Sequence, residues 1–297
     1  MKTKIKGYLK KLIKILSQPE MRILPSSFAF YVILAIIPLM TIVVLIASSF
    51  NISIELVGNL VSDVMPKQVS NIIIDVISGK GFDTHIGFFN VVAFVIASNG
   101  TYAIINMSNT LYKIKDRDVL KDRISSVILL FIIIILFVFM LVLPIFGENI
   151  LNLMNRASII SQYSDEVMKI FNAFKWPITI LIIYLNIKLL YTMAPSKNIK
   201  SEETTYGALF TTGAWVIATV IFRFYLAYFA RYDIIYGSLS SIIIMMAWVY
   251  ALSYIFVLGM AINASRREEQ ELYETQRLEL EKLKEINNKK EGTSKKK

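Results

Sequence analysis

The side chains of this sequence that could do chemistry lie inside long apolar stretches. One stretch carries amide and phenol groups at intervals of three or four residues, which places Asn99, Tyr102, Asn106 and Asn109 on one helical stripe. Polar groups are costly in hydrocarbon, so this stripe must face other helices or a wet cavity. Two roles stay open: hydrogen bonding between helices, and lining of a cavity for a ligand. Gly100 would allow close backbone approach or local unwinding beside Asn99.

A second candidate is Arg223, which lies in another apolar stretch with Thr219 on the same helical face. One interpretation is that the long side chain snorkels to the outer headgroups. The other is that the guanidinium faces a cavity and attracts an anion, such as a lipid phosphate or carboxylate. In the first apolar stretch, Pro38 predicts a kink or hinge, because proline removes one backbone hydrogen bond.

The sequence offers little for enzyme chemistry. There is no cysteine and only one histidine, His85, which excludes thiolate nucleophiles, disulfides and multi-histidine metal centres. Asp116, Asp118 and Asp122 alternate with lysine and arginine, a pattern typical of a solvated loop. No P-loop or Ser–His–Asp set is present. We therefore predict that the protein is not an enzyme and holds no cofactor and no metal.

Six apolar stretches must position these residues. They cover residues 27–50, 87–107, 124–146, 174–194, 205–230 and 237–262. Each is close to or above the ~20 residues that a helix needs to cross a ~30 Å hydrocarbon core. The predicted fold is therefore an all-α integral membrane protein with six transmembrane helices.

The basic residues predict how the chain is threaded. The formal net charge is +10, and most lysines and arginines lie before the first stretch, in gaps 108–123 and 195–204, and after the last stretch. Cytoplasmic segments retain lysine and arginine, so both termini are predicted to be cytoplasmic. The charge is thereby explained without nucleic acid, which we do not expect as a partner.

The chain divides into three predicted regions. These are a cytoplasmic basic amphipathic helix at 1–24, a transmembrane domain at 25–263 with amphipathic helices in the external loops 51–86 and 147–173, and a charged cytoplasmic helix at 264–297 that becomes a disordered tail from residue 287. The N-terminal helix has a basic face suited to an anionic inner leaflet.

Several motifs share their order and spacing with a known family. They are Ser26-Ser27-Phe28-Ala29-Phe30-Tyr31 with Ile37-Pro38-Leu39, Ser98-Asn99-Gly100 with Asn106 and Leu111-Tyr112, Trp176-Pro177 with Tyr191 and Pro195, and Tyr236-Gly237-Ser238 with Trp248-Val249-Tyr250 and Gly259 to Asn263. Over residues 15–265 the chain resembles the YihY/BrkB family of bacterial inner-membrane proteins. The resemblance implies a multi-pass protein of the bacterial cell membrane. Ala261 departs from the family pattern, which commonly has an acidic residue there.

These observations favour a transporter, or a protein that handles lipids or other amphiphiles, acting alone or as a homo-oligomer. Its expected partners are membrane lipids, including anionic ones, and its substrate is not identified by the sequence. The alternative is a scaffold that does not transport and whose basic cytoplasmic tails bind lipid or a partner. Some members of the resembled family carry a ribonuclease label, which the residues of this chain do not support.

Overall fold

The computed structural model describes residues 12–49, 86–136, 164–228 and 236–294, with positions 67, 70, 71 and 74 between the first two ranges. Its elements are a short helix at 12–16, α2 (Glu20–Ser49), α5 (Ile86–Leu111), a helix at 119–136, α7 (Ser164–Met193), α8 (Thr205–Tyr228), the 3-10 turn η1 (Gly237–Leu239) and α10 (Ser240–Ser294). No strand occurs in these ranges, which confirms the all-α prediction. Residues 1–11 of the helix predicted at 1–24, and most of the two predicted external loops, lie outside the described residues. The described part of that helix is interrupted by a turn at residues 17–19, and α2 begins directly after it.

Three helices among the described residues are long and apolar enough to span a membrane. They are Trp176–Met193 within α7, Thr205–Tyr228, which is α8, and Ser240–Lys284 within α10. They coincide with the last three predicted stretches. The first three predicted stretches fall on α2, α5 and the helix 119–136, but parts of them lie beyond the described side chains. Six spans and two cytoplasmic termini therefore stay predictions.

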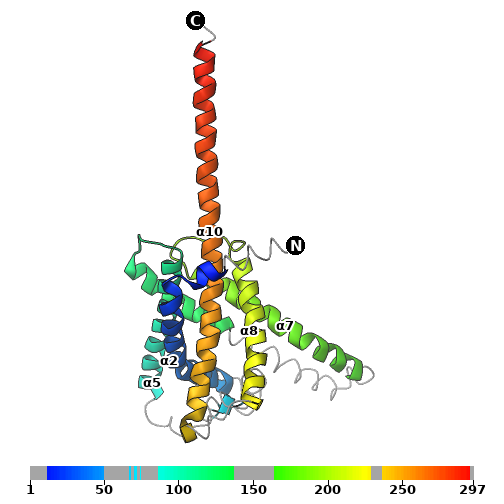
Figure 1. Cartoon of the computed structure of the whole chain (residues 1–297). Helices are drawn as coiled ribbons and strands as arrows, with labels where there is room; N and C mark the ends of the chain where they lie inside the picture. The colour runs from blue at the N-terminus through cyan, green and yellow to red at the C-terminus, as the bar shows by residue number, and fades with distance from the viewer. Residues whose placement is uncertain are drawn as a thin grey trace.

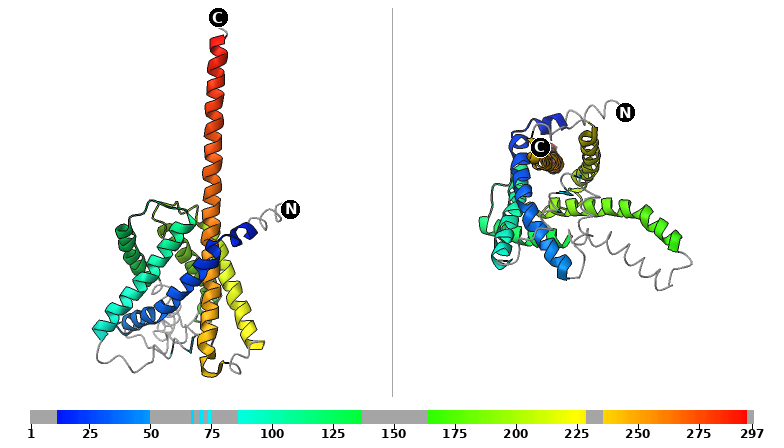
Figure 2. Two further views of the ribbon diagram at one scale, coloured as in Figure 1. Left: turned by 60° about the vertical axis from the view of Figure 1, so that its left-hand side comes forward. Right: turned by 90° about the horizontal axis from the view of Figure 1, so that it is seen from below.

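The first half of α10 lies at the centre of the bundle. It packs against α2 on one side and α8 on the other, while α5 packs against α2 and α7 against α8 (Figure 1). Beyond the bundle α10 continues as a long exposed helix (Figure 2). The helix ends at Ser294, whereas the sequence predicted a disordered tail from residue 287.

Small residues bring α8 and α10 into close contact. A Cβ added at Gly207 would overlap the Gly259 carbonyl and the side chain of Asn263. Asn263 uses this proximity: its Oδ1 accepts from Gly207 N at 2.7 Å, and its Nδ2 donates to the Thr204 carbonyl at 3.1 Å. The first turn of α8 has free N–H groups, so Asn263 caps α8 from a different helix.

Tyr191 joins α7 to the same crossing. It is fully buried, its hydroxyl donates to the Phe256 carbonyl at 2.6 Å, and it lies 2.7 Å from Thr211 Oγ1. Phe28 of α2 and Trp215 of α8 stack on Phe256. These aromatic contacts hold α2, α7, α8 and α10 together.

Two helices that contain proline run on without interruption. Helix α7 has Pro177 inside it and begins at Ser164, so residues 164–173 of the predicted external loop are continuous with the helix of the fourth span. Its first part extends away from α10 (Figures 1 and 2). Helix α2 continues past residue 38 to Ser49, so Pro38 does not end it.

Candidate functional site

Three residues of the predicted polar stripe line one pocket between α2 and α5. Asn99, Tyr102 and Asn106 face a cavity of about 260 Å³. The other lining residues are Leu24, Ser27, Phe28 and Tyr31 of α2, Ala103, Met107 and Thr110 of α5, and Arg123 of the helix 119–136. The pocket therefore combines apolar side chains with amide, hydroxyl, phenol and guanidinium groups.

The end of α5 turns the chain back toward this pocket. Ile114 N donates to the Asn109 carbonyl at 2.9 Å, and Lys113 N donates to the Thr110 carbonyl at 3.1 Å. This is the hydrogen-bond pattern of a Schellman helix end. Lys113 takes the left-handed conformation, with φ of 56°, where glycine is the usual residue. A glycine after α5 would have predicted this turn from the sequence, but the chain has Lys113 at that position.

The following helix starts at a side-chain cap. Asp118 Oδ1 accepts from the backbone N of Leu120 at 3.0 Å and of Lys121 at 3.2 Å. Such a cap stabilises a helix by about 0.5–2 kcal/mol. The helix is then attached to α5, because Thr101 Oγ1 donates to the Ser126 carbonyl at 2.8 Å in a buried position. Together these bonds set where Arg123, one turn into the helix, meets α5.

Two arginines bind the amides of the polar stripe. Arg123 Nη1 donates to Asn99 Oδ1 at 2.9 Å, and its guanidinium carbon lies 3.8 Å from the centre of the Tyr102 ring. Arg117 Nη1 donates to Asn106 Oδ1 at 2.9 Å. Among the described residues neither guanidinium has a carboxylate at ion-pair distance. The pocket is therefore electropositive, a property that sequence reasoning missed by treating both arginines as loop residues.

The fourth residue of the stripe belongs to a separate buried cluster. Asn109 is buried, and its Nδ2 lies 2.5 Å from Ser196 Oγ, while its Oδ1 accepts from Ser196 N at 2.8 Å. Ser196 Oγ also donates to Asp122 Oδ1 at 2.5 Å. The prediction of a solvated Asp122 is wrong: its side chain is 3% exposed. The return of the helix 119–136 along α5 turns this face inward.

The other predicted residues are placed as follows. Thr219 and Arg223 lie on α8, which packs against α10 and α7, and neither lines the α2–α5 pocket. Arg223 is exposed. Gly100 is buried where α5 meets α2, and a Cβ there would lie 3.8 Å from Ala35 Cβ. The α-helix is intact at Gly100, so this position provides close approach rather than unwinding.

Comparisons with known proteins show which family the chain belongs to. Residues 13–283 match the family model described as virulence factor BrkB. The chain belongs to the virulence factor BrkB family. The resemblance seen in the sequence is thereby confirmed.

Similar proteins carry either a ribonuclease-like name or a membrane-protein name. Ribonuclease-like protein YfkH of Bacillus subtilis (strain 168) is 27% identical over 263 residues, which cover 87% of this chain and 94% of that protein. UPF0761 membrane proteins of Vibrio campbellii and Photobacterium profundum are 22% and 25% identical, cover 88% of this chain each, and are themselves covered over 82% and 81% of their length. No solved structure matches. The protein is therefore a membrane protein of the BrkB and UPF0761 group.

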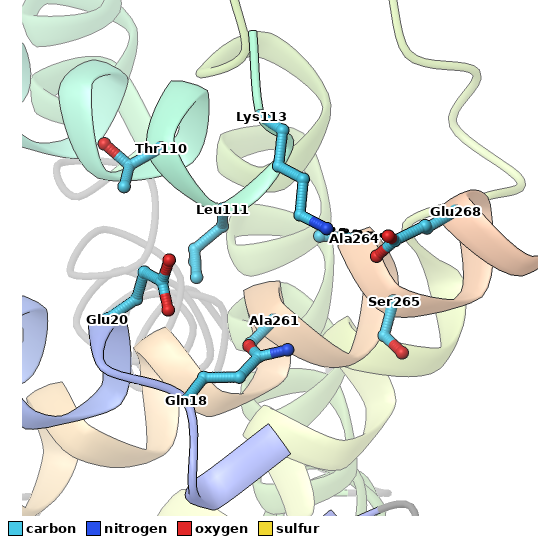
Figure 3. A pocket seen from close by; sticks show the side chains of 9 residues that line it. All are labelled: Gln18, Glu20, Thr110, Leu111, Lys113, Ala261, Ala264, Ser265 and Glu268. Atoms are coloured by element: carbon cyan, nitrogen blue, oxygen red, sulfur yellow. Dashed lines mark hydrogen bonds and ion pairs between the residues drawn. The ribbon is translucent and has the colours of Figure 1, made fainter. Parts of the chain in front are cut away.

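A second pocket lies next to the first at the end of α5 and shares Thr110 with it. It measures about 230 Å³ and is lined by Gln18, Glu20, Thr110, Leu111, Lys113, Ala261, Ala264, Ser265 and Glu268 (Figure 3). Lys113 Nζ lies 2.6 Å from Glu268 Oε1. Ala261, where the sequence resemblance implied an acidic residue, is buried against this pocket.

The part of α10 that leaves the bundle contacts the segment after α5, the segment before α8 and the first turn of α8. Arg267 pairs with Glu203 at 3.3 Å, and the Arg266 guanidinium lies 3.6 Å from the centre of the Tyr206 ring. Together with the Lys113–Glu268 pair, these contacts connect α10 to the segments after α5 and before α8. Tyr112, which is influenced by the charges of Arg267 and Glu203, is largely buried. This burial raises the pKa of its phenol above the ordinary value.

Proposed function

We propose that the protein is a transporter, or a protein that handles lipids or other amphiphiles, in the bacterial cell membrane. The observation that carries this proposal is the α2–α5 pocket, because its lining has two characters. Asn99, Asn106 and Arg123 offer hydrogen bonds, while Phe28 and Met107 offer apolar surface. An amphiphile needs both at once, since its headgroup and its chain differ in polarity.

Apolar side chains beside the pocket support an amphiphile as its ligand. Ile23 and Phe30 on α2, and Leu120 and Ile124 on the helix 119–136, are all exposed. Large exposed apolar side chains on a membrane protein suit contact with lipid chains. A ligand could therefore place its headgroup in the pocket while its chain stays in the bilayer.

The second pocket supports a path from the end of α5 into the first one. Both pockets have Thr110 in their lining, so they are neighbours. The Lys113–Glu268 pair lies at the end of this path. If the termini are cytoplasmic, as the charges predict, the path opens to the inner surface.

A scaffold is the second candidate, and the long extension of α10 is the observation that favours it. Residues beyond Glu271 are exposed wherever their side chains are described, and they offer surface to a partner. The first contacts of this extension, through Arg267 and Glu268, belong to the bundle. A deletion of residues 272–297 therefore separates the two functions: it spares a transporter and disables a scaffold.

The test is a comparison of lipids and metabolites between a deletion strain and strains complemented with variants. We expect wild-type protein and Lys121→Gln to restore the parent profile, because Lys121 is exposed on the same helix and does not line the pocket. We expect Asn99→Leu and Asn106→Leu to fail at normal membrane abundance. Full restoration by both leucine variants would contradict a role for the pocket.

A further inference from the structure

We infer that the α2–α5 pocket binds the phosphate headgroup of an anionic amphiphile, with Arg123 as the main ligand and Arg117 at its edge. This inference rests on the proposed function, because it names the class of substrate for the same pocket. Three features of the described residues carry it: the unused donors of the guanidinium groups, the lack of a compensating carboxylate, and the apolar surroundings of Arg123.

The first feature is the donor capacity of the arginines. A guanidinium has five N–H donors in a planar fork that matches phosphate oxygens. The described contacts of Arg123 are one hydrogen bond to Asn99 and the stacking on Tyr102, so most of its donors remain available. Arg117 likewise donates once, to Asn106. The amide and the ring fix the plane of Arg123 before any ligand arrives, which lowers the entropic cost of binding.

The second feature is the charge balance around the pocket. The nearest acidic residues along the chain are Asp116, Asp118 and Asp122. Asp118 caps its own helix, and Asp122 accepts from Ser196 in the separate buried cluster. The carboxylate of Glu20 lines the second pocket rather than the first. Since the partners of both guanidinium groups are neutral amides, their charge is available to an oxyanion.

The third feature is the apolar frame of Arg123, which favours an amphiphile over a free anion. Leu120 and Ile124, one turn before it and directly after it, are 76% and 63% exposed. Leu24 and Phe28 line the pocket from α2. The cavity of about 260 Å³ lies below the range of about 300–1,000 Å³ for pockets that enclose drug-sized ligands. It suits a headgroup whose chain remains outside.

The test is a binding titration with purified full-length protein in neutral detergent. The probes are short-chain phosphatidic acid, phosphatidylcholine of the same chain length, and inorganic phosphate. We expect the wild type and Lys121→Gln to prefer phosphatidic acid. We expect Arg123→Gln to weaken its binding by roughly ten- to hundredfold, as for the loss of a charged hydrogen bond. Arg123→Lys keeps the charge without the fork and should bind with intermediate affinity.

The outcomes separate the sources of the anion and the two proposals. Equal binding of phosphatidic acid and phosphatidylcholine, or no change in Arg123→Gln, would overturn the inference. Inorganic phosphate binding as tightly as phosphatidic acid would overturn the amphiphile assignment. Circular dichroism of each variant identifies a loss of fold, and Arg123→Lys then serves in place of Arg123→Gln. If binding depends on Arg123 but Asn99→Leu fully complements the deletion strain, the proposed function fails and the headgroup site stands.

Discussion

Replacement of Asn263 by alanine tests whether α10 caps α8. The Asn263 side chain is 1% exposed and forms two hydrogen bonds, to Gly207 N at 2.7 Å and to the Thr204 carbonyl at 3.1 Å. Loss of a helix N-cap costs about 0.5–2 kcal/mol. The Thr204 carbonyl also accepts from Ala208 N at 3.1 Å, so it keeps a partner in the variant.

The second bond therefore adds only about 0.6 kcal/mol, the average for side-chain bonds between helices in a membrane protein. The expected total loss is about 1–2.5 kcal/mol. The assay is reversible unfolding in mixed micelles with increasing denaturing detergent, followed by tryptophan fluorescence. Thr275→Ala is the matched control, because Thr275 lies on the exposed extension of the same helix and bonds only to the backbone of its own helix, at Glu271. Equal midpoints for Asn263→Ala, Thr275→Ala and wild type would refute the capping role.

Three further predictions concern packing and charge. Asp122→Ala should lower the free energy of unfolding by about 1–3 kcal/mol, because it leaves the buried Asn109 amide and the partly buried Ser196 hydroxyl with fewer partners; unchanged stability in the same unfolding assay would contradict the buried cluster. Gly207→Ala should lower the unfolding midpoint or the folded yield, since its Cβ would overlap α10. Gly213→Ala, with nothing within 4 Å of the added Cβ, should leave the free energy of unfolding unchanged or raise it by up to about 1 kcal/mol. Because burial raises the pKa of Tyr112 in the folded state, the unfolded chain loses this proton first and stability should fall as pH rises above about 10. The midpoint of Tyr112→Phe should fall less steeply over that range, and parallel pH profiles would count against the raised pKa.

Helical periodicity was enough to predict three of the residues that line the pocket. Asn99, Tyr102 and Asn106 recur at three and four residues, and the structure places all three around one pocket. The period of an α-helix alone decides which side chains share a face. The exclusion of Arg223 from this pocket could not be predicted in this way, because a face that is shared within α8 does not tell which helices are neighbours.

The arginines were missed for a different physical reason. Arg117 and Arg123 lie in a basic segment between two apolar stretches, and most such residues are solvated. Their contact with the stripe depends on a turn at Lys113, where a lysine adopts a conformation that usually signals itself through glycine. The burial of Asp122 depends on the same turn. One backbone conformation without a sequence signal thus explains both why the two arginines were missed and why Asp122 was assigned to a solvated loop.

The polar stripe makes two kinds of contact, in different parts of α5. Asn99 and Asn106 are half-buried, and each gives its amide oxygen to an arginine at or beside the pocket. Asn109 is buried, and its amide forms hydrogen bonds with Ser196, which join α5 to the segment after α7. Next to the turn at Lys113, the stripe therefore joins α5 to the segment after α7. Earlier in α5, Asn99 and Asn106 orient the arginine side chains. The turn at Lys113 sets the position of the helix 119–136, which carries both Asp122 and Arg123. The stability of the buried cluster of Asn109, Asp122 and Ser196 is therefore linked to the geometry of the pocket.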